Sequence, residues 1–427
     1  MSQIKLIPTK LKGKVSVPPS KSLAHRAIIA ASLAKGISRI DHIEYSQDIK
    51  ATIGAMEALG TIIEQHEDYL IINGNYTFTK NNTMPGVQID CEESGSTLRF
   101  MVPISLAKEN KVRFIGRGQL GKRPLDTYYE IFERQNIGYL YRENVLDLNV
   151  VGELKPDLYR IPGNISSQFI TGLLFALPLL SFDSIIEITT PLESKGYIDL
   201  TLQVLKLYGI EIVNHEYKQF IVRGRQEYKA RDYRVESDFS QAAFYLVAGA
   251  LGNDVTLLDL NLDSLQGDKA TIDFLKQMNC EIVENDEGIK VVSHGLKATI
   301  VDASQCPDVI PVVSLALAVA SGHSEVINAG RLRIKECDRL QATVEELNKL
   351  KAHAVEHESS MELDGVETVT GGNVSSHDDR MAMMLAIAST VCKEPVIIDN
   401  KECVKKSYPS FWEDFEMLGG KIDGGNL

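Results

Sequence analysis

Hydrophobic and polar positions along the chain repeat one local pattern: an amphipathic helix, a small or turn-forming residue, and a strand of alternating polarity. Apolar residues at helical spacing and strict alternation over a few residues predict these two kinds of element. The pattern occurs six times, with its turns at Gly60, Asn136, Gly209, Asn279, Lys351 and Gly419. Glycine and asparagine are typical of a helix end that needs a left-handed residue.

The turns are 76, 73, 70, 72 and 68 residues apart. This period exceeds that of solenoid repeats, and it suits a small α/β module of several strands and two helices. The alternative is chance spacing in an ordinary α/β protein, and the near-constant interval argues against it. The polar segment 227–236 separates the third copy from the fourth, so we expect three modules on each side. A strand predicted over residues 5–17 can pair with either half.

The composition of the chain excludes several classes of function and partner. The length of 427 residues predicts two to three domains, and the net charge of −13 argues against nucleic acid and acidic membranes as partners. The apolar stretches 170–180 and 310–320 are too short to span a bilayer and should form buried helices. The six cysteines form no Cys-x-x-Cys pair, and the first residues lack the apolar core of a signal peptide. We therefore expect a cytoplasmic protein with reduced thiols and no zinc site.

The segment Pro18-Pro19-Ser20-Lys21-Ser22 is the clearest candidate for anion binding. The prolines keep the backbone extended, and a helix then begins near Ser20 to Ser22. Free backbone N–H groups, a lysine and a serine meet at that helix end, and Arg26 follows one turn later on the same face. The alternative is a capped helix with two solvated cations.

Cations recur at turns and helix starts, and such cations could line one cleft. They are Lys21 and Arg26, Arg99, Lys122 and Arg123, Lys335 and Arg339, Arg380, and Lys405 and Lys406. The charged run 333–339 is expected to open the helix that continues to residue 350, with Glu336 facing Arg339 at i,i+3. A lattice of solvated ion pairs is the alternative for this run.

Small and hydroxyl residues accompany these cations. Gly95 lies in a turn that allows close backbone approach, and Ser166, Ser167 and Gln168 open an apolar helix. Ser194, Lys195 and Tyr197 are expected in the loop before a further helix. Helix capping is the alternative role for the serines.

Two aspartates precede very apolar helices. Asp308 and Asp238 are each either an N-cap or a carboxyl whose pKa is raised by desolvation.

Two motif matches do not fit their usual sites. Gly116-Arg117-Gly118-Gln119-Leu120-Gly121 has the dinucleotide spacing, but 122–124 delay the helix that should meet the pyrophosphate. His353 and His357 match a zincin pattern, but on the predicted strand they would lie about 13 Å apart. We therefore expect neither a nicotinamide cofactor nor a catalytic zinc.

Taken together, these residues make the chain resemble the family of 5-enolpyruvylshikimate-3-phosphate synthase (3-phosphoshikimate 1-carboxyvinyltransferase), from about residue 5 to 422. The motifs that carry the resemblance are Pro19-Ser20-Lys21-Ser22-x-x-x-Arg26, Ser166-Ser167-Gln168, Arg333-x-Lys335-Glu336-x-Asp338-Arg339, Asp378-x-Arg380-Met381-Ala382-Met383 and Lys406-Ser407-Tyr408-Pro409. The resemblance implies an α/β fold of two similar domains, each with three βαβαββ units around a pseudo-threefold axis, an inside-out α/β barrel. Domain 1 would comprise 1–19 and 236–427, domain 2 would comprise 20–235, and the active site would lie in the cleft between them.

The resemblance also implies a reaction: the 5-hydroxyl of shikimate 3-phosphate attacks phosphoenolpyruvate, and phosphate leaves. It implies that shikimate 3-phosphate binds on the side of domain 2. The residues expected to bind it are Lys21, Ser22, Arg26, Ser166, Ser167, Gln168, Ser194, Tyr197, Asp308 and Lys335. The resemblance places phosphoenolpyruvate, on the side of domain 1, on Lys21, Gly95, Arg123, Gln168, Arg339, Arg380 and Lys406. Asp308 and Glu336, assisted by Lys21, would handle protons. No cofactor or metal is implied, and the family expectation is a cytoplasmic monomer of the shikimate pathway that glyphosate targets.

The chain departs from the family pattern at Glu92-Glu93, at Asp379 in place of a histidine, and at Arg331 in place of an asparagine. The related UDP-N-acetylglucosamine enolpyruvyl transferases are the alternative enzyme, but the chain lacks their Lys-x-x-x-Asn start and the cysteine of the loop at 117–123. A non-catalytic scaffold whose cationic turns bind phosphate is the alternative of a different class.

Overall fold

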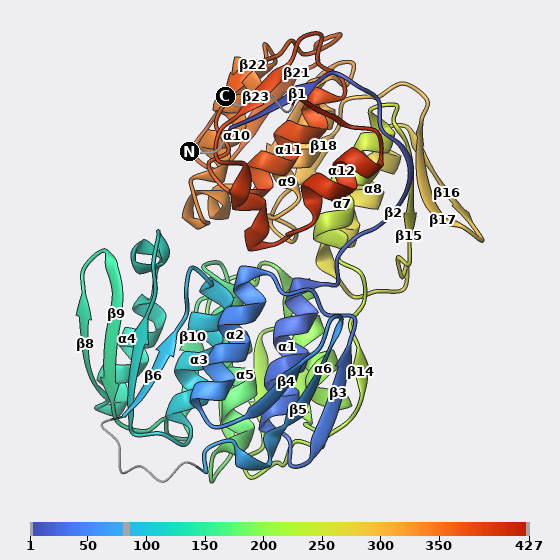
Figure 1. Cartoon of the computed structure of the whole chain (residues 1–427). Coiled ribbons are helices and arrows are strands. Elements are labelled where there is room, and N and C mark those ends of the chain that lie inside the picture. Colours follow the sequence, from blue (N-terminus) through green and yellow to red (C-terminus); the bar gives the residue numbers. More distant parts are fainter. Residues whose placement is uncertain (1–2, 80–85, 424–427) are drawn as a thin grey trace. The chain divides into compact units, whose positions relative to one another are not determined.

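A computed structural model describes residues 3–79 and 86–423 of the chain. The chain divides into two compact units. Unit 1 comprises Met1–Pro18 and Ser237–Leu427, and unit 2 comprises Pro19–Glu236. Within the described ranges each unit contains three four-stranded sheets. Figure 1 shows the ribbon of the chain with many of its helices and strands labelled.

The sheets of unit 2 are built from strands that follow one another in the sequence, with one exception. The first has the order β6 Val87–Asp90, β7 Lys111–Ile115, β9 Val145–Val151, β8 Gly138–Arg142. The second has the order β10 Leu158–Ile161, β11 Ser184–Ile188, β13 Gln219–Val222, β12 Ile212–His215. The third has the order β14 Tyr233–Arg234, β3 Ile37–Asp41, β5 Tyr69–Asn73, β4 Ile62–Gln65. The exception is β14, which joins strands from the start of the unit.

Unit 1 repeats this design. Its first sheet has the order β18 Ile300–Asp302, β19 His323–Ile327, β21 Met361–Asp364, β20 His353–Glu356. The second has the order β22 Gly372–Val374, β23 Val396–Ile398, β1 Ile4–Ile7, β24 Lys421–Asp423. The third has the order β2 Lys12–Ser16, β15 Asp254–Leu258, β17 Gly288–Ser293, β16 Cys280–Asn285.

All of these sheets share one topology: an edge strand pairs parallel with its neighbour, and the next two pairings are antiparallel. Parallel neighbours need a crossover helix, whereas antiparallel neighbours need only a turn. The sheets therefore confirm the small α/β module that the spacing of the turns predicts. In the three sheets that begin with β6, β10 and β18, strands and helices follow one another in the order βαβαββ that the resemblance implies.

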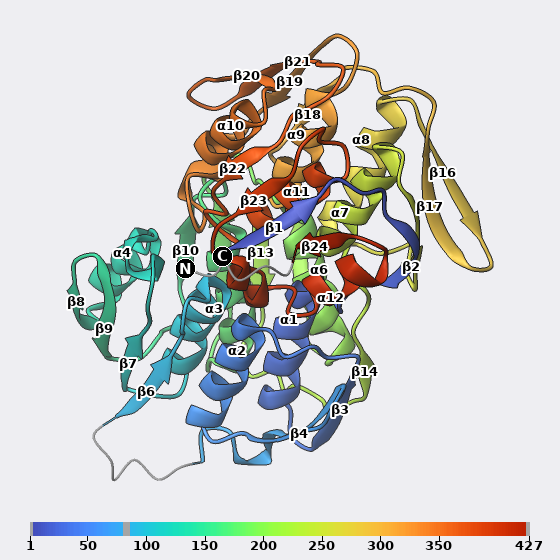
Figure 2. The ribbon, with the colours of Figure 1, turned by 45° about the horizontal axis from the view of Figure 1, so that its top comes forward.

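The strand predicted over residues 5–17 is two strands that serve two different sheets. Pro8 lacks a backbone N–H and ends β1, and β2 begins at Lys12. Leu6 of β1 lies opposite Val396 on one side and Ile422 on the other. Figure 2 shows β1 between β23 and β24. The N-terminal segment thus completes unit 1 rather than unit 2.

The first helix of each repeat is buried almost all round and the second buries one face. The inner helices are α1 Lys21–Leu33, α3 Gly95–Leu106, α5 Ser167–Ala176, α7 Phe239–Ala250, α9 Ile310–Ala318 and α11 Asp379–Ser389. The outer helices are α2 Gln47–Ala58, α4 Asp126–Gln135, α6 Lys195–Leu207, α8 Ala270–Gln277, α10 Arg339–Lys349 and α12 Phe411–Met417. Short 3₁₀ turns are η1 Gly74–Tyr76, η2 Leu120–Lys122, η3 Leu177–Leu179, η4 Gly267–Lys269, η5 Gly330–Ile334 and η6 Lys401–Lys406.

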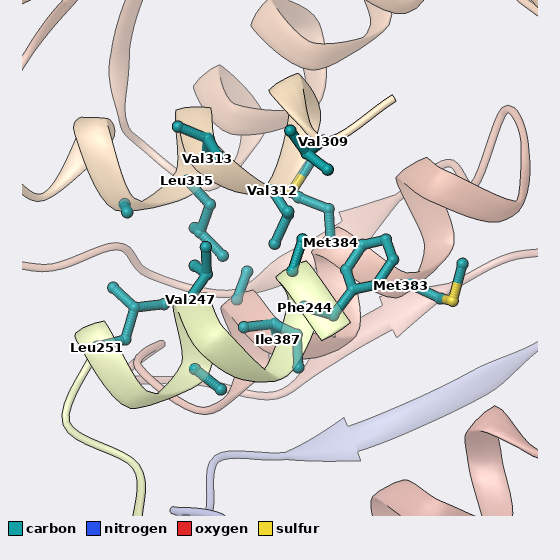
Figure 3. Close-up of a cluster of buried hydrophobic side chains, with 14 of the residues drawn as sticks. Phe244, Val247, Leu251, Val309, Val312, Val313, Leu315, Met383, Met384 and Ile387 are labelled. Atoms are coloured by element: carbon teal, nitrogen blue, oxygen red, sulfur yellow. The ribbon is translucent and has the colours of Figure 1, made fainter. Parts of the chain in front are cut away.

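The inner helices form the core of each unit. In unit 1, Phe244 of α7, Val312 of α9 and Ile387 of α11 belong to one cluster of buried side chains (Figure 3). This arrangement explains why 170–180 and 310–320 are apolar without a polar face, because α5 and α9 have no solvent side. None of the helices in the described part of the chain combines the length and the apolar character needed to cross a membrane.

The six turns found in the sequence are confirmed as left-handed residues at the ends of the outer helices. Their φ angles are +106° at Gly60, +55° at Asn136, +82° at Gly209, +69° at Asn279, +67° at Lys351 and +90° at Gly419. Lys351 adopts this conformation although its Cβ disfavours it. The geometry of the repeat therefore outweighs the local preference at this position.

Candidate functional site

The N-terminus of α1 lies where the sequence predicts. Ser20 is the N-cap, and its hydroxyl accepts a hydrogen bond from the backbone N–H of Leu23. The Lys21 ammonium donates to Asp48 Oδ2 of α2 at 2.7 Å. Only 20% of the Lys21 side chain and 8% of the Asp48 side chain are exposed, so this ion pair is held in a fixed position at the helix end.

Arg26 is buried rather than solvated. Its guanidinium donates to Thr201 Oγ1 at 2.9 Å, to the Ser22 carbonyl at 2.7 Å and to the Tyr197 carbonyl at 3.0 Å. These acceptors are neutral, and burial lowers the pKa of Arg26 to about 10. A buried cation held by neutral groups favours an anion beside it.

Residues at the start of α5 are connected to α3. Ser166 caps α5 and accepts from the Gln168 N–H. The Gln168 amide accepts from Arg99 at 2.8 Å and donates to Ser96 Oγ at 2.9 Å. Arg99 also donates to the Pro124 carbonyl. Gln168 therefore has a fixed orientation.

Gly95 and Arg123 are in direct contact. A Cβ at Gly95 would lie 2.4 Å from the Arg123 Nη1 atom, so the guanidinium packs against the first residue of α3. The close approach expected at Gly95 is thus made by Arg123 itself in this structure.

Ser194 is the buried N-cap of α6, with φ of +55°. Lys195 and Tyr197 lie in the first turn of this helix, so their expected placement in a loop is wrong. The reason is that Ser194, not a residue further on, makes the left-handed turn that starts the helix.

In unit 1, Arg339 organises the charged residues. Its guanidinium donates to Asp308 at 2.8 Å, to Glu336 at 2.8 Å and to Asp378 at 2.6 Å. Only 3% of its side chain is exposed. Burial opposes the charge, but Asp378, Glu336 and Asp308 together raise the pKa of Arg339 well above its usual value.

This network corrects two expectations about residues 333–339. Helix α10 begins only at Arg339, because Asp338 is its N-cap and accepts from the Gln341 N–H. The residues before it form η5 and a short irregular segment with bends at 335–337. The alternative of a solvated ion-pair lattice is also wrong, since Arg339 is buried.

Asp308 is neither an N-cap nor a carboxyl with a raised pKa, which are the two roles that its position predicts. Val309 is the N-cap of α9 and no side chain caps that helix. Asp308 accepts instead from Lys335 at 3.1 Å and from Arg339. Burial acts to raise the pKa of Asp308, but Lys335, Arg339 and Arg380 outweigh it and hold this pKa well below the usual range. Asp238, by contrast, is an N-cap that accepts from Ser240 N and Gln241 N.

Arg380 and Lys406 are both buried, with 4% and 8% exposure. Arg380 donates to the Ser240 carbonyl at 3.1 Å and to Gln241 Oε1 at 3.3 Å, both on α7. Asp379, at the position where the resemblance implies a histidine, accepts from the Ser407 hydroxyl next to Lys406. Asp379 Oδ1 also lies 3.9 Å from Arg339, so this departure adds another carboxylate to the Arg339 network.

The polar residues at the helix starts of unit 2 form one cluster, and the charged residues around Arg339 in unit 1 form another. The sequence analysis did not predict the roles of several residues in these two clusters. Arg99 stood out only as a recurring cation, yet it orients Gln168. Asp268 accepts from the Ser240 hydroxyl, and its burial, with the charge of Asp308, raises its pKa to about 6. No motif marks Asp268, which lies in η4 between Gly267 and Lys269.

The arrangement suits chemistry on anions. Unit 2 gathers cations, hydroxyls and an amide at the N-termini of α1, α3, α5 and α6, where backbone N–H groups attract negative charge. Unit 1 gathers buried cations with carboxylates that differ in pKa. Cations that are fixed in place stabilise developing negative charge, and carboxyls of unequal pKa can move protons.

Comparison with known proteins matches residues 6–415 to the model of the family EPSP synthase (3-phosphoshikimate 1-carboxyvinyltransferase). The chain is 57% identical to the 3-phosphoshikimate 1-carboxyvinyltransferase of Clostridioides difficile (strain 630), with all of both chains covered. It is 56% identical to that of Clostridium perfringens (strain ATCC 13124), covering 99% of this chain and 100% of the other.

Solved structures share the fold. An EPSP synthase from Acinetobacter baumannii aligns with a TM-score of 0.81 at 23% identity, covering 99% of both chains. The enolpyruvyl transferase NikO from Streptomyces tendae aligns with a TM-score of 0.81 at 15% identity, covering 99% of this chain and 98% of the other.

Proposed function

This chain belongs to the EPSP synthase family, whose enzymes transfer the enolpyruvyl group of phosphoenolpyruvate to shikimate 3-phosphate, and we propose that the residues of its two clusters bind these substrates and carry the transfer. It is a transferase of the shikimate pathway. Unit 2 supplies most of the contacts to shikimate 3-phosphate, and both units supply cations to phosphoenolpyruvate.

Shikimate 3-phosphate binds at the helix starts of unit 2. Arg26 supplies a buried cation without a carboxylate among its hydrogen-bond acceptors, and Ser22, Ser166, Ser167, Ser194 and Tyr197 supply donors around it. Asp308 and Lys335 contact its ring hydroxyls. These neutral and cationic donors match a phosphate and several hydroxyls.

Phosphoenolpyruvate binds to Arg123, Arg339, Arg380 and Lys406, with Gly95 and Gln168 completing the site. Its carboxylate and phosphate compete with the carboxylates that now surround Arg339. Lys21 lies between the two substrates. The enzyme acts as a cytoplasmic monomer.

The transfer proceeds by addition and then elimination. The 5-hydroxyl oxygen bonds to C2 of phosphoenolpyruvate while its proton goes to Asp308, and C3 gains a proton from Glu336. C3 then loses a proton as the C2–O bond to phosphate breaks, which restores the double bond and releases phosphate. Holding two substrates in position supplies much of the acceleration.

The observation that carries these assignments is the bridge made by Arg339. One buried guanidinium holds Asp308 and Glu336 at 2.8 Å each, so the two proton-handling groups are fixed beside a single cation. The ionised state of Asp308, favoured by its low pKa, is the state that accepts a proton.

The test is phosphate release from chelator-treated protein given phosphoenolpyruvate with shikimate 3-phosphate, and separately with UDP-N-acetylglucosamine. Release only with shikimate 3-phosphate is expected. Release only with the nucleotide sugar would show that the chain acts as a UDP-N-acetylglucosamine enolpyruvyl transferase. Release with neither acceptor would favour a protein that binds phosphate without catalysing the transfer.

Lys21→Met and Arg123→Ala should each lower turnover by about 100-fold or more, the scale of a lost preorganised charge. Lys35→Met is the matched control, since Lys35 and Lys21 each donate to a carboxylate at 2.7 Å but Lys35 is 74% exposed. Equal activity in Lys21→Met and Lys35→Met would refute the role of Lys21.

A further inference from the structure

Glu346 is a fully buried acid on α10 that lies outside the residues assigned to substrate binding and proton transfer. Its side chain is 0% exposed. Its Oε1 accepts from His377 Nε2 at 2.7 Å and from Lys349 Nζ at 2.7 Å, and its Oε2 accepts from the Ser375 N–H at 2.9 Å. Two of these three donors belong to the segment that leads into α11.

The same segment is held at its other end by Arg339. Arg339 and Glu346 are seven residues apart on α10, which is about two turns or roughly 10 Å along one face. Arg339 binds Asp378, and Glu346 binds Ser375 and His377. Residues 375–378 therefore run along α10 with a contact at each end.

His377 is strained between these two contacts. Its φ is +51°, a left-handed conformation that costs free energy for a residue with a Cβ. The next residue is Asp378, the N-cap of α11, whose carboxylate contacts Arg339. Strain persists only where surrounding contacts fix it, and here the contact is the ion pair with Glu346.

A metal does not account for this cluster. Ligand atoms of Glu345, Glu346 and His377 lie within 4.8 Å of one another. However, the Lys349 ammonium and the His377 ring both occupy Oε1 of Glu346. The Lys349 ammonium and the ring nitrogen of His377 on one carboxylate oxygen form a hydrogen-bonded ion-pair cluster.

We propose that Glu346 and His377 are positioning residues for the transfer reaction, which hold Asp378 against Arg339 and so orient the Arg339 guanidinium toward phosphoenolpyruvate. This inference rests on the proposed role of Arg339. His377 does not touch substrate, and it acts through the start of α11.

The contact gives the reaction a dependence on pH. The hydrogen bond to Glu346, opposed by burial, raises the pKa of His377 above its ordinary 6.5. The charged groups around the ring are Glu345, Glu346 and Lys349 of α10, and Asp399 binds the neighbouring Ser376. Because the folded pKa is raised, the ion pair is complete below pH 6.5 and is lost as pH rises through the folded pKa.

The experiment compares His377→Ala, His377→Gln and the control His323→Ala. His323 also bonds a carboxylate, Asp364 at 2.8 Å, but is 50% exposed. His377→Ala should raise the KM for phosphoenolpyruvate about tenfold with a smaller change in kcat, since a small misplacement of a binding group is costly. His377→Gln keeps a donor to Glu346 and should restore most of the affinity without the loss at alkaline pH. His323→Ala should match the unaltered enzyme.

An NMR titration of the histidine rings gives a readout that does not depend on turnover. The pKa of His377 should fall toward its ordinary value in Glu346→Gln. An unaltered KM and pH profile in His377→Ala, or an unaltered His377 titration in Glu346→Gln, would overturn the inference. Absence of turnover in the unaltered protein would instead refute the proposed function, while the titration would still decide whether Glu346 controls His377.

Discussion

Replacing Asp268 by asparagine should stabilise unit 1 in a way that depends on pH. Asp268 is 3% exposed, and burial together with the charge of Asp308 raises its pKa from 3.8 to about 6. A raised carboxyl pKa means that the fold favours the protonated form, so ionisation destabilises the native state as pH rises. Asparagine keeps the shape and an acceptor for Ser240 but cannot ionise.

The magnitude follows from the shift of about two pKa units. Each unit corresponds to about 1.4 kcal/mol, so the variant should gain about 3 kcal/mol in the free energy of unfolding at pH 7. At pH 5, Asp268 is only partly ionised in the unaltered fold, and the gain should be about half as large. The gain should vanish below pH 4 and level off above pH 7.

The assay is urea unfolding between pH 5 and 8, followed by tryptophan fluorescence. Trp412, the only tryptophan of the chain, lies on α12 and reports on unit 1. Asp286→Asn is the matched control, because Asp286 is exposed in the turn between β16 and β17. A gain of equal size at pH 5 and pH 8, or no gain at pH 8, would refute the argument that burial holds the proton on Asp268.

Two further predictions concern backbone positions. Gly95→Ala should push the Arg123 guanidinium away, because the new Cβ would lie 2.4 Å from it, and should raise the KM for phosphoenolpyruvate about tenfold. Gly54→Ala, in α2 with nothing within 4 Å of a Cβ, should leave that KM unchanged, and equal values in the two variants would contradict the prediction. Lys351→Gly should relieve the left-handed strain and raise the free energy of unfolding by about 0.5–1 kcal/mol, since the relief exceeds the entropy cost of glycine. An unfolding midpoint at or below that of the unaltered protein would show that Lys351 is not strained.

The repeat was readable from the sequence because helix ends leave a local chemical mark. Five of the six turns carry glycine or asparagine, and the sixth follows from the interval alone. The helix starts at Ser20 and Ser166 could also be predicted, since a serine cap can be recognised from the residues beside it.

Features that depend on contacts between distant segments could not be read from the sequence. The position of Asp308 before an apolar helix predicts a helix cap, but its carboxylate accepts hydrogen bonds from Lys335 and Arg339, about 30 residues later in the sequence. The sequence is compatible with a solvated Arg26, but in the fold its guanidinium is buried and donates to Thr201 and Tyr197 of α6. Glu346 looks like any polar position on an amphipathic helix, and only the return of the chain at Ser375 buries it. In each case the fold brings the two partners together from distant parts of the sequence, and a local sequence pattern does not predict which distant residue will be the partner.

The placement of β1 has a consequence for how the chain acquires its structure on the ribosome. β1 lies between β23 and β24, and Lys5 pairs with Asp423, which is 418 residues away. At about 5–20 residues per second, the ribosome exposes β1 roughly 20–80 s before its partners. Unit 2 is continuous in sequence and can complete its own sheets during this interval, whereas unit 1 must wait for the last strand. Until β23 and β24 emerge, both edges of β1 lack their native partner strands, so the first strand of the chain is among the last to be paired.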